Sequence, residues 1–409
     1  MKRLQVISNS EVGVFRSCRA RWGFEYHGML RPRVPARVMT WGNAIHAGVE
    51  GGYLAAFAWP YRPGADVAKE AAAAAVDVYH GDYVARLDEM VDAGHVQPEQ
   101  ADELWSDSNK MLRVAKWACG HYFDATADDM DRLVPLGFEV PFRVPVYNAA
   151  GRASFLWLTG KIDGLWWDPE TQQVVVDDLK TTDELHGTTE KRIAMDPQLS
   201  GYMHAARHML RAGTIGPLDG TQLPPTAADR IGSCRYNVIR RSMPRAPSVN
   251  KVRKNDGLHT VTQQLADREK ATGESHGLVS TAAIDTTADV YDRALLDQVD
   301  RGLQVTDKQR ALLERLRQQG DRYFARFAFW RTAEDLARWR DELWTEARLM
   351  RSAERSAALR TRNPGQCTQA NSLPCAYRPV CMDDTDETRA LYRVAGSRHE
   401  EVDHGDQRG

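Results

Sequence analysis

The sequence of 409 residues lacks long hydrophobic runs, a signal-peptide core and any excess of positive charge. No run reaches the roughly 18 apolar residues that a membrane-spanning helix needs, and Met1–Ser10 has only isolated apolar residues after its two cations. We therefore expect a cytoplasmic, intracellular protein without a membrane partner. The net charge of −2 excludes a globally basic nucleic-acid-binding protein, so contact with a polyanion would require local clusters of positive charge.

The sequence also contains no internal repeat and no Gly-x-x-x-x-Gly-Lys-Ser/Thr motif. The missing motif excludes the usual phosphate-binding loop of ATP-driven motors. Any reaction that needs such a motor therefore requires a second protein to supply it.

Cysteine is scarce as well, and its six residues are unevenly placed. Cys367, Cys375 and Cys381 lie within 15 residues near the C-terminus, while Cys18 lies near the N-terminus. A reducing compartment disfavours a disulfide framework, so the C-terminal group requires another explanation.

The spacing of apolar residues predicts an α/β protein with helical additions. A helix over 9–28 with Ser10 as its N-cap, another over 40–57 and an Ala-rich helical stretch come before Val134. From there the sequence alternates and is rich in β-branched and aromatic residues, which is typical of strands. The expected strands lie at 136–146, 153–167, 173–180 and 233–241, with a helix at 196–211.

The same patterns divide the chain into five predicted regions. They are an N-terminal helical region (1–130), a core (131–245), a polar insertion (246–285), a C-terminal helical region (286–382) and a charged tail (383–409). The insertion is low in apolar residues, so we expect it to be long and partly mobile. The tail is expected to be disordered because it is short of apolar residues that could anchor it.

Two carboxylates and a lysine are predicted to converge on the hairpin of the central strands. Asp163 lies on one strand and Asp178 on the next, beyond the turn sequence Asp-Pro-Glu-Thr. Asp178 and Lys180 are two residues apart and so share a face of their strand. Such a group suits phosphodiester hydrolysis, because carboxylates bind Mg²⁺, a bound metal acidifies water and an ammonium stabilises developing charge. A surface hairpin with a simple Asp–Lys ion pair is the alternative.

Five motifs occur in order between residues 41 and 202. They are Trp41-Gly42-Asn-Ala-Ile-His46, Gly137-Phe-Glu139-Val, Gly160-Lys-Ile-Asp163, Asp178-Leu-Lys180 and Gln198-Leu-Ser-Gly-Tyr202. The series resembles the RecB-type branch of the PD-(D/E)XK nucleases. The resemblance implies a restriction-endonuclease-like core, in which a mixed β-sheet is flanked by helices, and a metal-dependent DNA nuclease.

The resemblance also implies roles for individual residues around a Mg²⁺ or Mn²⁺ ion. The candidate metal ligands are His46, Glu139, Asp163, Asp178 and the backbone carbonyl of Leu179; the candidate catalytic residues are Asp163, Asp178, Lys180, Gln198 and Tyr202. Glu139 would hold a second metal or a metal-bound water. Gln198 and Tyr202, one helical turn apart, would line the site and contact DNA or the lysine. Packing against the sheet is the alternative for His46 and for Tyr202.

The cysteines extend the resemblance to nucleases with an iron–sulfur cluster, including the AddB subunit and the CRISPR-adaptation nucleases. In these proteins one N-terminal and three C-terminal cysteines hold a 4Fe–4S cluster. Here that role would fall to Cys18, Cys367, Cys375 and Cys381, which would join the two ends of the chain. The sequence departs from the pattern by having seven residues, not two, between the second and third cysteines. Four thiolates also suit Zn²⁺, which is one alternative, and free thiols are the other.

The longest run of like charge lies at 231–254, with seven cations and no Asp or Glu. Clustered cations can track phosphates without reading sequence, and a solvated loop is the alternative. The candidate DNA-binding residues are Arg235, Arg240, Arg241, Arg245, Lys251, Arg253 and Lys254.

The sequence thus predicts a Mg²⁺- or Mn²⁺-dependent deoxyribonuclease. By resemblance it would be an exonuclease acting on single-stranded DNA, or on DNA with free ends, in recombination, repair or DNA processing, and a recombination or helicase partner would supply any unwinding. Three alternatives stay open: a non-catalytic module that binds DNA or a partner on a nuclease-like fold, a zinc-stapled endonuclease, and a zinc-stapled scaffold protein in which the hairpin is only structural. The single-domain form with a polar insertion also resembles nucleases encoded by bacterial viruses (phages).

Overall fold

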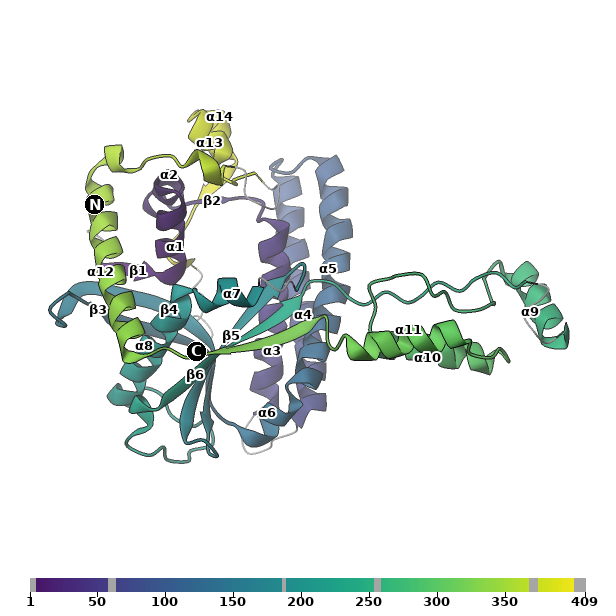
Figure 1. Cartoon of the computed structure of the whole chain (residues 1–409). Coiled ribbons are helices and arrows are strands. Elements are labelled where there is room, and N and C mark those ends of the chain that lie inside the picture. The colour runs from purple at the N-terminus through teal and green to yellow at the C-terminus, as the bar shows by residue number, and fades with distance from the viewer. Residues whose placement is uncertain (1–4, 58–63, 186–188, 254–258, 368–373, 401–409) are drawn as a thin grey trace. The chain divides into compact units, whose positions relative to one another are not determined.

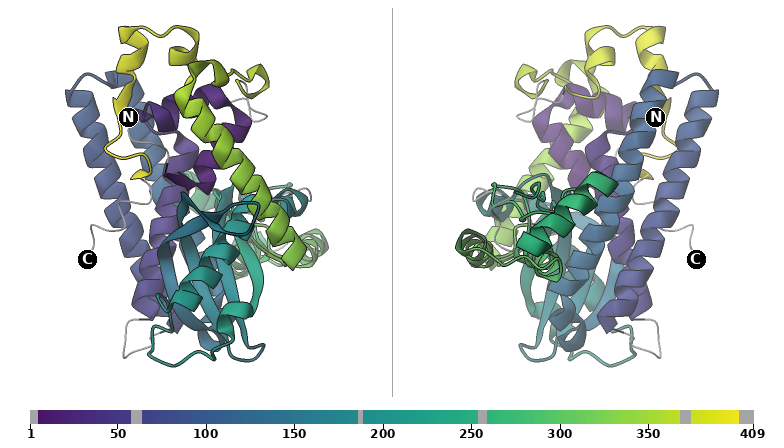
Figure 2. Two further views of the ribbon diagram at one scale, coloured as in Figure 1. Left: turned by 90° about the vertical axis from the view of Figure 1, so that its left-hand side faces the viewer. Right: turned by 90° about the vertical axis from the view of Figure 1, so that its right-hand side faces the viewer.

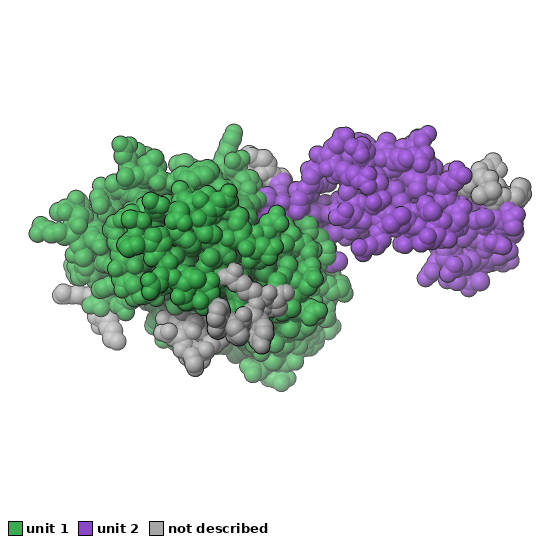
Figure 3. All heavy atoms as spheres, turned by 90° about the horizontal axis from the view of Figure 1, so that it is seen from below, with its two compact units in different colours: residues 1–181, 186–238, 326–409 green, residues 182–185, 239–325 purple. Residues whose placement is uncertain are grey.

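The computed structural model describes residues 5–57, 64–185, 189–253, 259–367 and 374–400. The chain forms two compact units, coloured separately in Figure 3. Unit 1 consists of residues 1–181, 186–238 and 326–409, and unit 2 of residues 182–185 and 239–325. Within the described ranges, no helix is both long enough and apolar enough to cross a membrane.

Unit 1 is built around a six-stranded mixed sheet (Figure 1). Its long strands β3 (Val134–Tyr147), β4 (Ala153–Asp168) and β5 (Gln173–Thr182) form an antiparallel meander. The remaining strands are β1 (Val6–Ser8), which runs parallel to β4, β6 (Ile231–Arg240) and β7 (Phe324–Phe329). Each of the four strands predicted in this part of the chain is present.

Helices lie on both sides of this sheet, as Figures 1 and 2 show. One layer contains α3 (Arg37–Ala56), α4 (Gly64–Asp92), α5 (Pro98–Ala125) and the short α6 (Ala127–Arg132). The other contains α1 (Asn9–Ser17), α8 (Pro197–Ala212) and α12 (Ala333–Arg355), with α7 (Thr189–Ala194) leading into α8. A mixed sheet flanked by helices confirms the predicted α/β class.

Close packing in the first layer depends on glycines of α3. A Cβ at Gly48 would lie 2.5 Å from Cys119 Sγ of α5, and one at Gly52 would lie 2.4 Å from the Phe123 ring. Beside them, Tyr53 stacks on Phe138 of β3 with ring centroids 4.5 Å apart. The glycines let α3 pack closely against α5, and Tyr53 packs it against the sheet; together these contacts fix the height at which the side chains of α3 meet the strands.

The predicted single helix over 9–28 is interrupted. Ser8 rather than Ser10 caps α1, accepting a hydrogen bond from Glu11 N at 3.1 Å. Cys18 has extended backbone between α1 and α2 (Arg19–Trp22), and a π-helical turn (Gly23–His27) follows. The interruption changes the direction of the chain at Cys18, which periodicity alone does not reveal.

The predicted disorder of the tail is wrong for residues 383–400. After α13 (Arg378–Met382) and α14 (Asp386–Ala390), β8 (Tyr392–Val394) pairs with β2 (Leu30–Pro32). The next residues, Arg398 and His399, bind the fully buried Glu11, with His399 Nε2 2.8 Å from Glu11 Oε2. Burial opposes the charge on Glu11, but these two partners hold its pKa below the ordinary value. The tail is ordered because its charges have a buried counter-ion; 401–409 lie outside the described residues.

Unit 2 has its own small core. Helices α9 (His259–Thr272), α10 (Ala288–Asp300) and α11 (Asp307–Gln318) belong to it, and Val249 forms an isolated β-bridge with Val279. The core residues are Val279, Tyr291, Leu295, Leu313 and Leu316. Because the apolar faces of α10 and α11 pack around Val279, the unit extends to Ala325, whereas the sequence suggested an insertion that ends at 285.

Candidate active site

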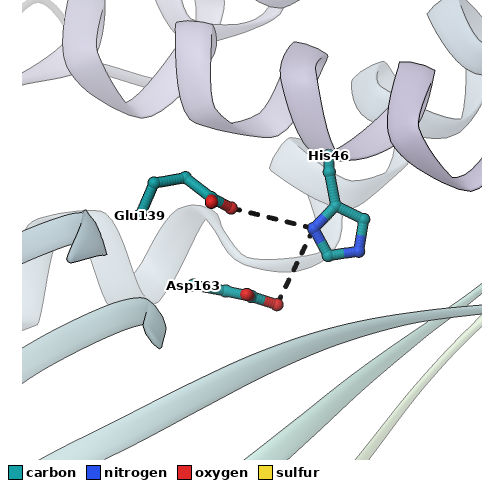
Figure 4. A group of neighbouring side chains, drawn as sticks. All are labelled: His46, Glu139 and Asp163. Atoms are coloured by element: carbon teal, nitrogen blue, oxygen red, sulfur yellow. Dashed lines mark ion pairs between the residues drawn. The ribbon is translucent and has the colours of Figure 1, made fainter. Parts of the chain in front are cut away.

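Three side chains from three elements meet beside the sheet (Figure 4). His46 comes from α3, Glu139 from β3 and Asp163 from β4. His46 Nδ1 lies 3.8 Å from Glu139 Oε1 and 3.8 Å from Asp163 Oδ2. One nitrogen and two carboxylate oxygens, all within 4.8 Å of one another, form a group that can hold a metal ion.

The strand register explains why Glu139 faces Asp163. The residues on either side of Glu139 pair with Gly164 and Ile162, which flank Asp163 on β4. Glu139 has a φ of 46°, in the left-handed region that residues other than glycine rarely adopt. Such a conformation costs about 1–3 kcal/mol and is concentrated at functional sites. The surrounding sheet therefore holds this carboxylate in place against its own backbone preference.

Glu139→Gly is expected to stabilise the metal-free protein while weakening metal binding. Glycine accepts a positive φ without strain, so the free energy of unfolding in EDTA should rise by about 1 kcal/mol. Loss of one carboxylate should raise the Kd for Mn²⁺ by about tenfold or more. Urea unfolding and calorimetric titration measure the two effects. Glu139→Gln is the control, because it loses the charge but keeps the side chain; equal stability of the two variants would show that no strain is stored here.

A second group of side chains links β5 to α8. Lys180 Nζ donates to Asp178 Oδ1 at 3.0 Å and to Gln198 Oε1 at 2.9 Å. Gln198 Nε2 in turn donates to the Tyr202 hydroxyl. The four residues thus form one hydrogen-bonded chain that fixes the position of the Lys180 ammonium.

Asp196 and Tyr236 support this chain, and neither was singled out from the sequence. Asp196 caps α8 and accepts hydrogen bonds from Gln198 N and from the Tyr236 hydroxyl, both at 2.8 Å. The Tyr236 ring centroid lies 5.6 Å from Lys180 Nζ, within range of a cation–π contact. Asp196 followed by Pro197 is a typical start of a helix. This pair is the sequence signal that indicates Asp196 as the N-cap of α8.

The backbone of β5 connects the two groups. Leu179 N–H donates to Asp163 Oδ2 at 2.7 Å, so Asp163 is tied to the strand that carries Asp178. Asp178 is wholly buried. Its Oδ2 lies 2.8 Å from Lys180 Nζ, yet it accepts no hydrogen bond from the described residues. The Lys180 ammonium is the counter-ion of this buried oxygen, which can also bind a further cation.

Burial and mutual repulsion set the protonation of these carboxylates. Burial raises the pKa of Asp163 to about 7; Asp178 and Glu139 add to this shift, and His46 and Lys180 oppose it. Burial also raises the pKa of Asp178, against the pull of Lys180. Burial disfavours the charged form of Lys180, but the neighbouring carboxylates outweigh it and raise the ammonium pKa. The site therefore concentrates more negative charge than its own lysine neutralises.

A hard divalent cation fits this donor set. The group offers carboxylate oxygens from Glu139 and Asp163, and the charge of Asp178 acts on Asp163 from the neighbouring strand. Mg²⁺ and Mn²⁺ favour oxygen ligands, and the single imidazole of His46 is compatible with Mn²⁺. The backbone carbonyl of Leu179 stays a predicted ligand.

The site opens onto a cleft of about 430 Å³. His46, Glu139 and Asp163 line it together with Gln198 and Tyr202. Lys161 lines it too. Because Lys161 precedes Asp163 by two residues on β4, both point to one face of the strand. The sequence indicated Lys161 only as part of a motif. Its position in the wall of the cleft allows its ammonium to bind a phosphate there.

Arg235, predicted to contact DNA, is an internal residue. Its side chain is buried and pairs with Asp177, Nε–Oδ1 at 2.5 Å and Nη2–Oδ2 at 2.7 Å, and with Asp129 Oδ1 at 3.1 Å. Trp166 Nε1 also donates to Asp177 at 2.9 Å. The guanidinium is thus the counter-ion of two buried carboxylates, and the prediction of a phosphate contact is wrong for this residue.

The rest of the basic run belongs to unit 2 and divides in two. Arg240 is buried and pairs with Asp285 at 2.7 Å, and the largely buried side chain of Arg241 pairs with Asp183 at 3.0 Å, so neither is available to a phosphate. The exposed members are Arg245, Lys251 and Arg253, while Lys254 lies outside the described residues. The cations of 231–254 are therefore consecutive in sequence but do not form one continuous basic surface.

One cavity of about 220 Å³ is lined by all four cysteines of the predicted cluster site: Cys18, Cys367, Cys375 and Cys381. All four are free thiols. The interruption between α1 and α2 brings the first of them to the cavity, and Cys375 N–H donates to Cys367 O at 3.1 Å. Arg21, Arg362 and Arg378 line the same cavity and supply positive charge around the thiols.

Comparison with known families agrees with this geometry. The model of the PD-(D/E)XK nuclease superfamily matches residues 6–382, so the chain belongs to that superfamily. Its mixed sheet flanked by helices is the restriction-endonuclease-like core that was predicted. Membership indicates a metal-dependent nuclease with DNA as its class of substrate. No curated protein matches the chain.

Proposed function

We propose that this nuclease is a Mg²⁺- or Mn²⁺-dependent deoxyribonuclease that degrades DNA from free ends in recombination, repair or DNA processing. The observation that carries the proposal is the meeting of His46, Glu139 and Asp163 next to the hydrogen-bonded pair of Asp178 and Lys180. The exposed cations of unit 2 are proposed to add phosphate contacts. They are Arg245, Lys251 and Arg253.

Each residue of the site has a distinct part in hydrolysis. A divalent cation held by His46, Glu139 and Asp163 would offset phosphate charge and lower the pKa of a water molecule. Lys180 keeps its proton at neutral pH because its pKa is raised, so it supplies positive charge to the transition state and does not act as a base. Gln198 holds that ammonium in one position. From the cleft wall, Lys161 would orient the substrate phosphate.

Linear and circular DNA distinguish the kinds of nuclease. End-labelled linear DNA and a covalently closed circle would be incubated with Mg²⁺, Mn²⁺ or EDTA. The proposal predicts metal-dependent loss of the linear DNA alone. Cutting of the circle would make the protein an endonuclease, and binding of both substrates without cleavage would make it a binding module.

Metal affinity is expected to rise with pH between about 6 and 8. Asp163 has a pKa of about 7 and must lose its proton before it binds metal, and the raised pKa of His46 acts in the same direction. The pKa of Asp163 in the folded protein lies above its unfolded value of 3.8. The metal-free protein therefore loses stability as pH rises through 7, and bound metal restores that stability.

Calorimetric titration with Mn²⁺ tests this expectation. The Kd at pH 6 should be about tenfold higher than at pH 8, because at one pH unit below the pKa of Asp163 only about a tenth of that carboxyl group is ionised. Asp163→Asn should bind weakly at both values. A wild-type Kd that does not change with pH would contradict the account.

We also propose that the four cysteines hold a 4Fe–4S cluster. Three observations support this assignment. The cavity of about 220 Å³ is much larger than a single ion needs, and three arginines line it, as suits four thiolates. Among the described residues, no three cysteine sulfurs lie within 4.8 Å of one another, whereas a zinc ion with Zn–S bonds of about 2.3 Å would bring them to about 3.8 Å.

Metal analysis of protein purified without oxygen tests the cluster. The expected result is about four irons and four acid-labile sulfides per chain. Cys375→Ser should lose most of both and should lower the melting temperature, whereas Cys234→Ala, a buried thiol elsewhere, should retain the iron. One zinc per chain without sulfide would replace the cluster by a zinc site, and absence of both metals would contradict either assignment.

A further inference from the structure

A second cleft, of about 380 Å³, lies between α8 and α12. We call it the arginine cleft after Arg207, Arg211 and Arg340, which line it with His204 and His208. Among the described residues that line it, none is acidic. Basic runs in the sequence do not reveal this group, because its members lie on two helices more than 120 residues apart.

The spacing along both helices explains the cleft. His204, Arg207, His208 and Arg211 recur at steps of three and four, so they form one stripe on α8. Opposite them, Ala333 and Ala337 of α12 also line the cleft and are one turn apart. Their small side chains leave room for the cleft beside the arginines of α8.

Two of the guanidinium groups have buried nitrogens that are not satisfied. Arg207 Nε and Arg340 Nε are both buried, and neither donates a hydrogen bond to a described residue. The carboxylate of Asp341 lies 3.6 Å from Arg340 Nε, which is too far for a hydrogen bond. Arg211, in contrast, pairs with Asp229 at 2.6 Å on the surface. Arg207 and Arg340 thus line the cleft without a hydrogen-bonded carboxylate among the described residues, so their charge is left for a ligand in the cleft.

His204 lines the cleft as a partly buried, uncharged side chain. Its ring packs between Tyr147 and Trp339, with centroids 5.6 Å and 5.5 Å away. Burial lowers its pKa to about 4, and His208, Arg207 and Arg340 add to the shift against the carbonyl of Pro145. At neutral pH His204 is therefore uncharged, and the positive charge of the cleft comes from its arginines. Planar guanidinium groups match the paired oxygens of a phosphate.

Helix α8 relates the cleft to the active site. Gln198, which binds the catalytic lysine, lies near its start, and Arg207 follows nine residues later. Nine residues correspond to about 13 Å along the helix and to the opposite side of it. A substrate that contacts both sites must therefore be several nucleotides long, whereas one confined to the metal site does not reach the arginine cleft.

We propose that the arginine cleft binds the sugar–phosphate backbone of the DNA substrate away from the cleavage site. The inference rests on the proposed function, because it takes DNA as the ligand. The cleft gives this nuclease, whose overall charge is negative, a local patch of cations that grips several phosphates at a distance from the metal.

The test is DNA binding by Arg207→Gln/Arg340→Gln. Fluorescence anisotropy with a labelled single-stranded 30-mer in EDTA measures Kd across a range of salt concentrations. The double variant should raise Kd about tenfold and reduce the slope of log K against log salt by about 1.4, the value for two lost phosphate contacts on a single strand. Arg338→Gln/Arg348→Gln is the matched control, since both arginines are exposed on α12 outside the cleft. An unchanged Kd and slope in the cleft variant would overturn the proposal.

Additional measurements distinguish DNA-backbone binding from misfolding and from capture of a free anion. Hydrolysis of the p-nitrophenyl ester of thymidine 5′-monophosphate should be unchanged in the cleft variant, because this substrate is too short to reach the cleft. Arg207→Lys/Arg340→Lys should keep most of the salt slope, which ties the effect to charge and not to folding. If inorganic phosphate raises the melting temperature of the wild type alone while DNA binding is equal in both, the cleft takes a free anion and the proposal fails. If the wild type hydrolyses no substrate, the proposed function fails, but the binding comparison still decides the cleft.

Discussion

Lys180→Met is expected to lower the kcat for DNA hydrolysis by at least about 10²–10³-fold. The ammonium lies between Asp178 and Gln198 and keeps its proton, so it is the one side-chain cation fixed beside the described carboxylate group by hydrogen bonds at both ends. Methionine fills a similar volume without the charge. Single-turnover hydrolysis of end-labelled DNA at saturating enzyme measures the loss without interference from binding.

The metal site should survive this substitution. Mn²⁺ titration of Lys180→Met should give one bound ion as in the wild type, because His46, Glu139 and Asp163 are untouched. Lys110→Met, which removes an exposed lysine of α5, is the control and should keep full activity. A Lys180→Met enzyme that retains more than a tenth of the wild-type kcat would remove the lysine from the mechanism.

Arg235→Ala is expected to reduce the free energy of unfolding by about 3–5 kcal/mol. The substitution leaves the buried Asp177 without the guanidinium that neutralises it, and leaves Asp129 with Arg326, 2.6 Å away, as its closest cation. Urea unfolding in the presence of EDTA measures the loss. The neighbouring exposed Arg230→Ala should change stability by less than about 0.5 kcal/mol.

This result also separates two roles for Arg235. A phosphate-binding arginine would leave stability intact on removal and would weaken DNA binding in a salt-dependent way. A loss of stability below about 1 kcal/mol together with weaker DNA binding would therefore restore the role that the sequence suggested.

The hairpin that carries the candidate site could be read from the sequence because its signals are local. Alternation along β4 and β5, and the turn between them, place Asp163 and Asp178 on adjacent strands. The two-residue spacing then puts Lys180 beside Asp178. His46 and Glu139, which lie on other elements, came only from resemblance to a family, since no local pattern shows that α3 crosses β3 and β4 at this height.

Long-range partners account for what the sequence could not show. Arg235 looked like part of a basic run because Asp177 and Asp129 are distant in sequence, and only the fold makes them neighbours. The charged tail looked disordered because its buried partner, Glu11, lies at the other end of the chain. A charge pattern shows only which residues are neighbours in sequence. Whether a charged side chain is buried, and which side chain it pairs with, depends on the topology of the fold.

Two local backbone conformations could also not be predicted from the sequence. The left-handed Glu139 lies in a strand whose sequence gives no sign of it, and Cys18 interrupts a helix whose periodicity continues on both sides. Both deviations occur at residues of the candidate sites, Glu139 in the group that can hold a metal and Cys18 in the wall of the cysteine cavity. Local rules fail here because the geometry of the site outweighs local preference.

The most direct test compares wild type and Asp163→Asn for Mn²⁺ binding and for hydrolysis of linear DNA in the same buffer. Asparagine can keep the acceptor for Leu179 N, so the fold should persist, while the charged ligand is lost. We expect one bound Mn²⁺ and metal-dependent hydrolysis for the wild type, and neither for the variant, with equal or higher stability of the variant in EDTA. Undiminished hydrolysis by Asp163→Asn would contradict the assignment of the active site.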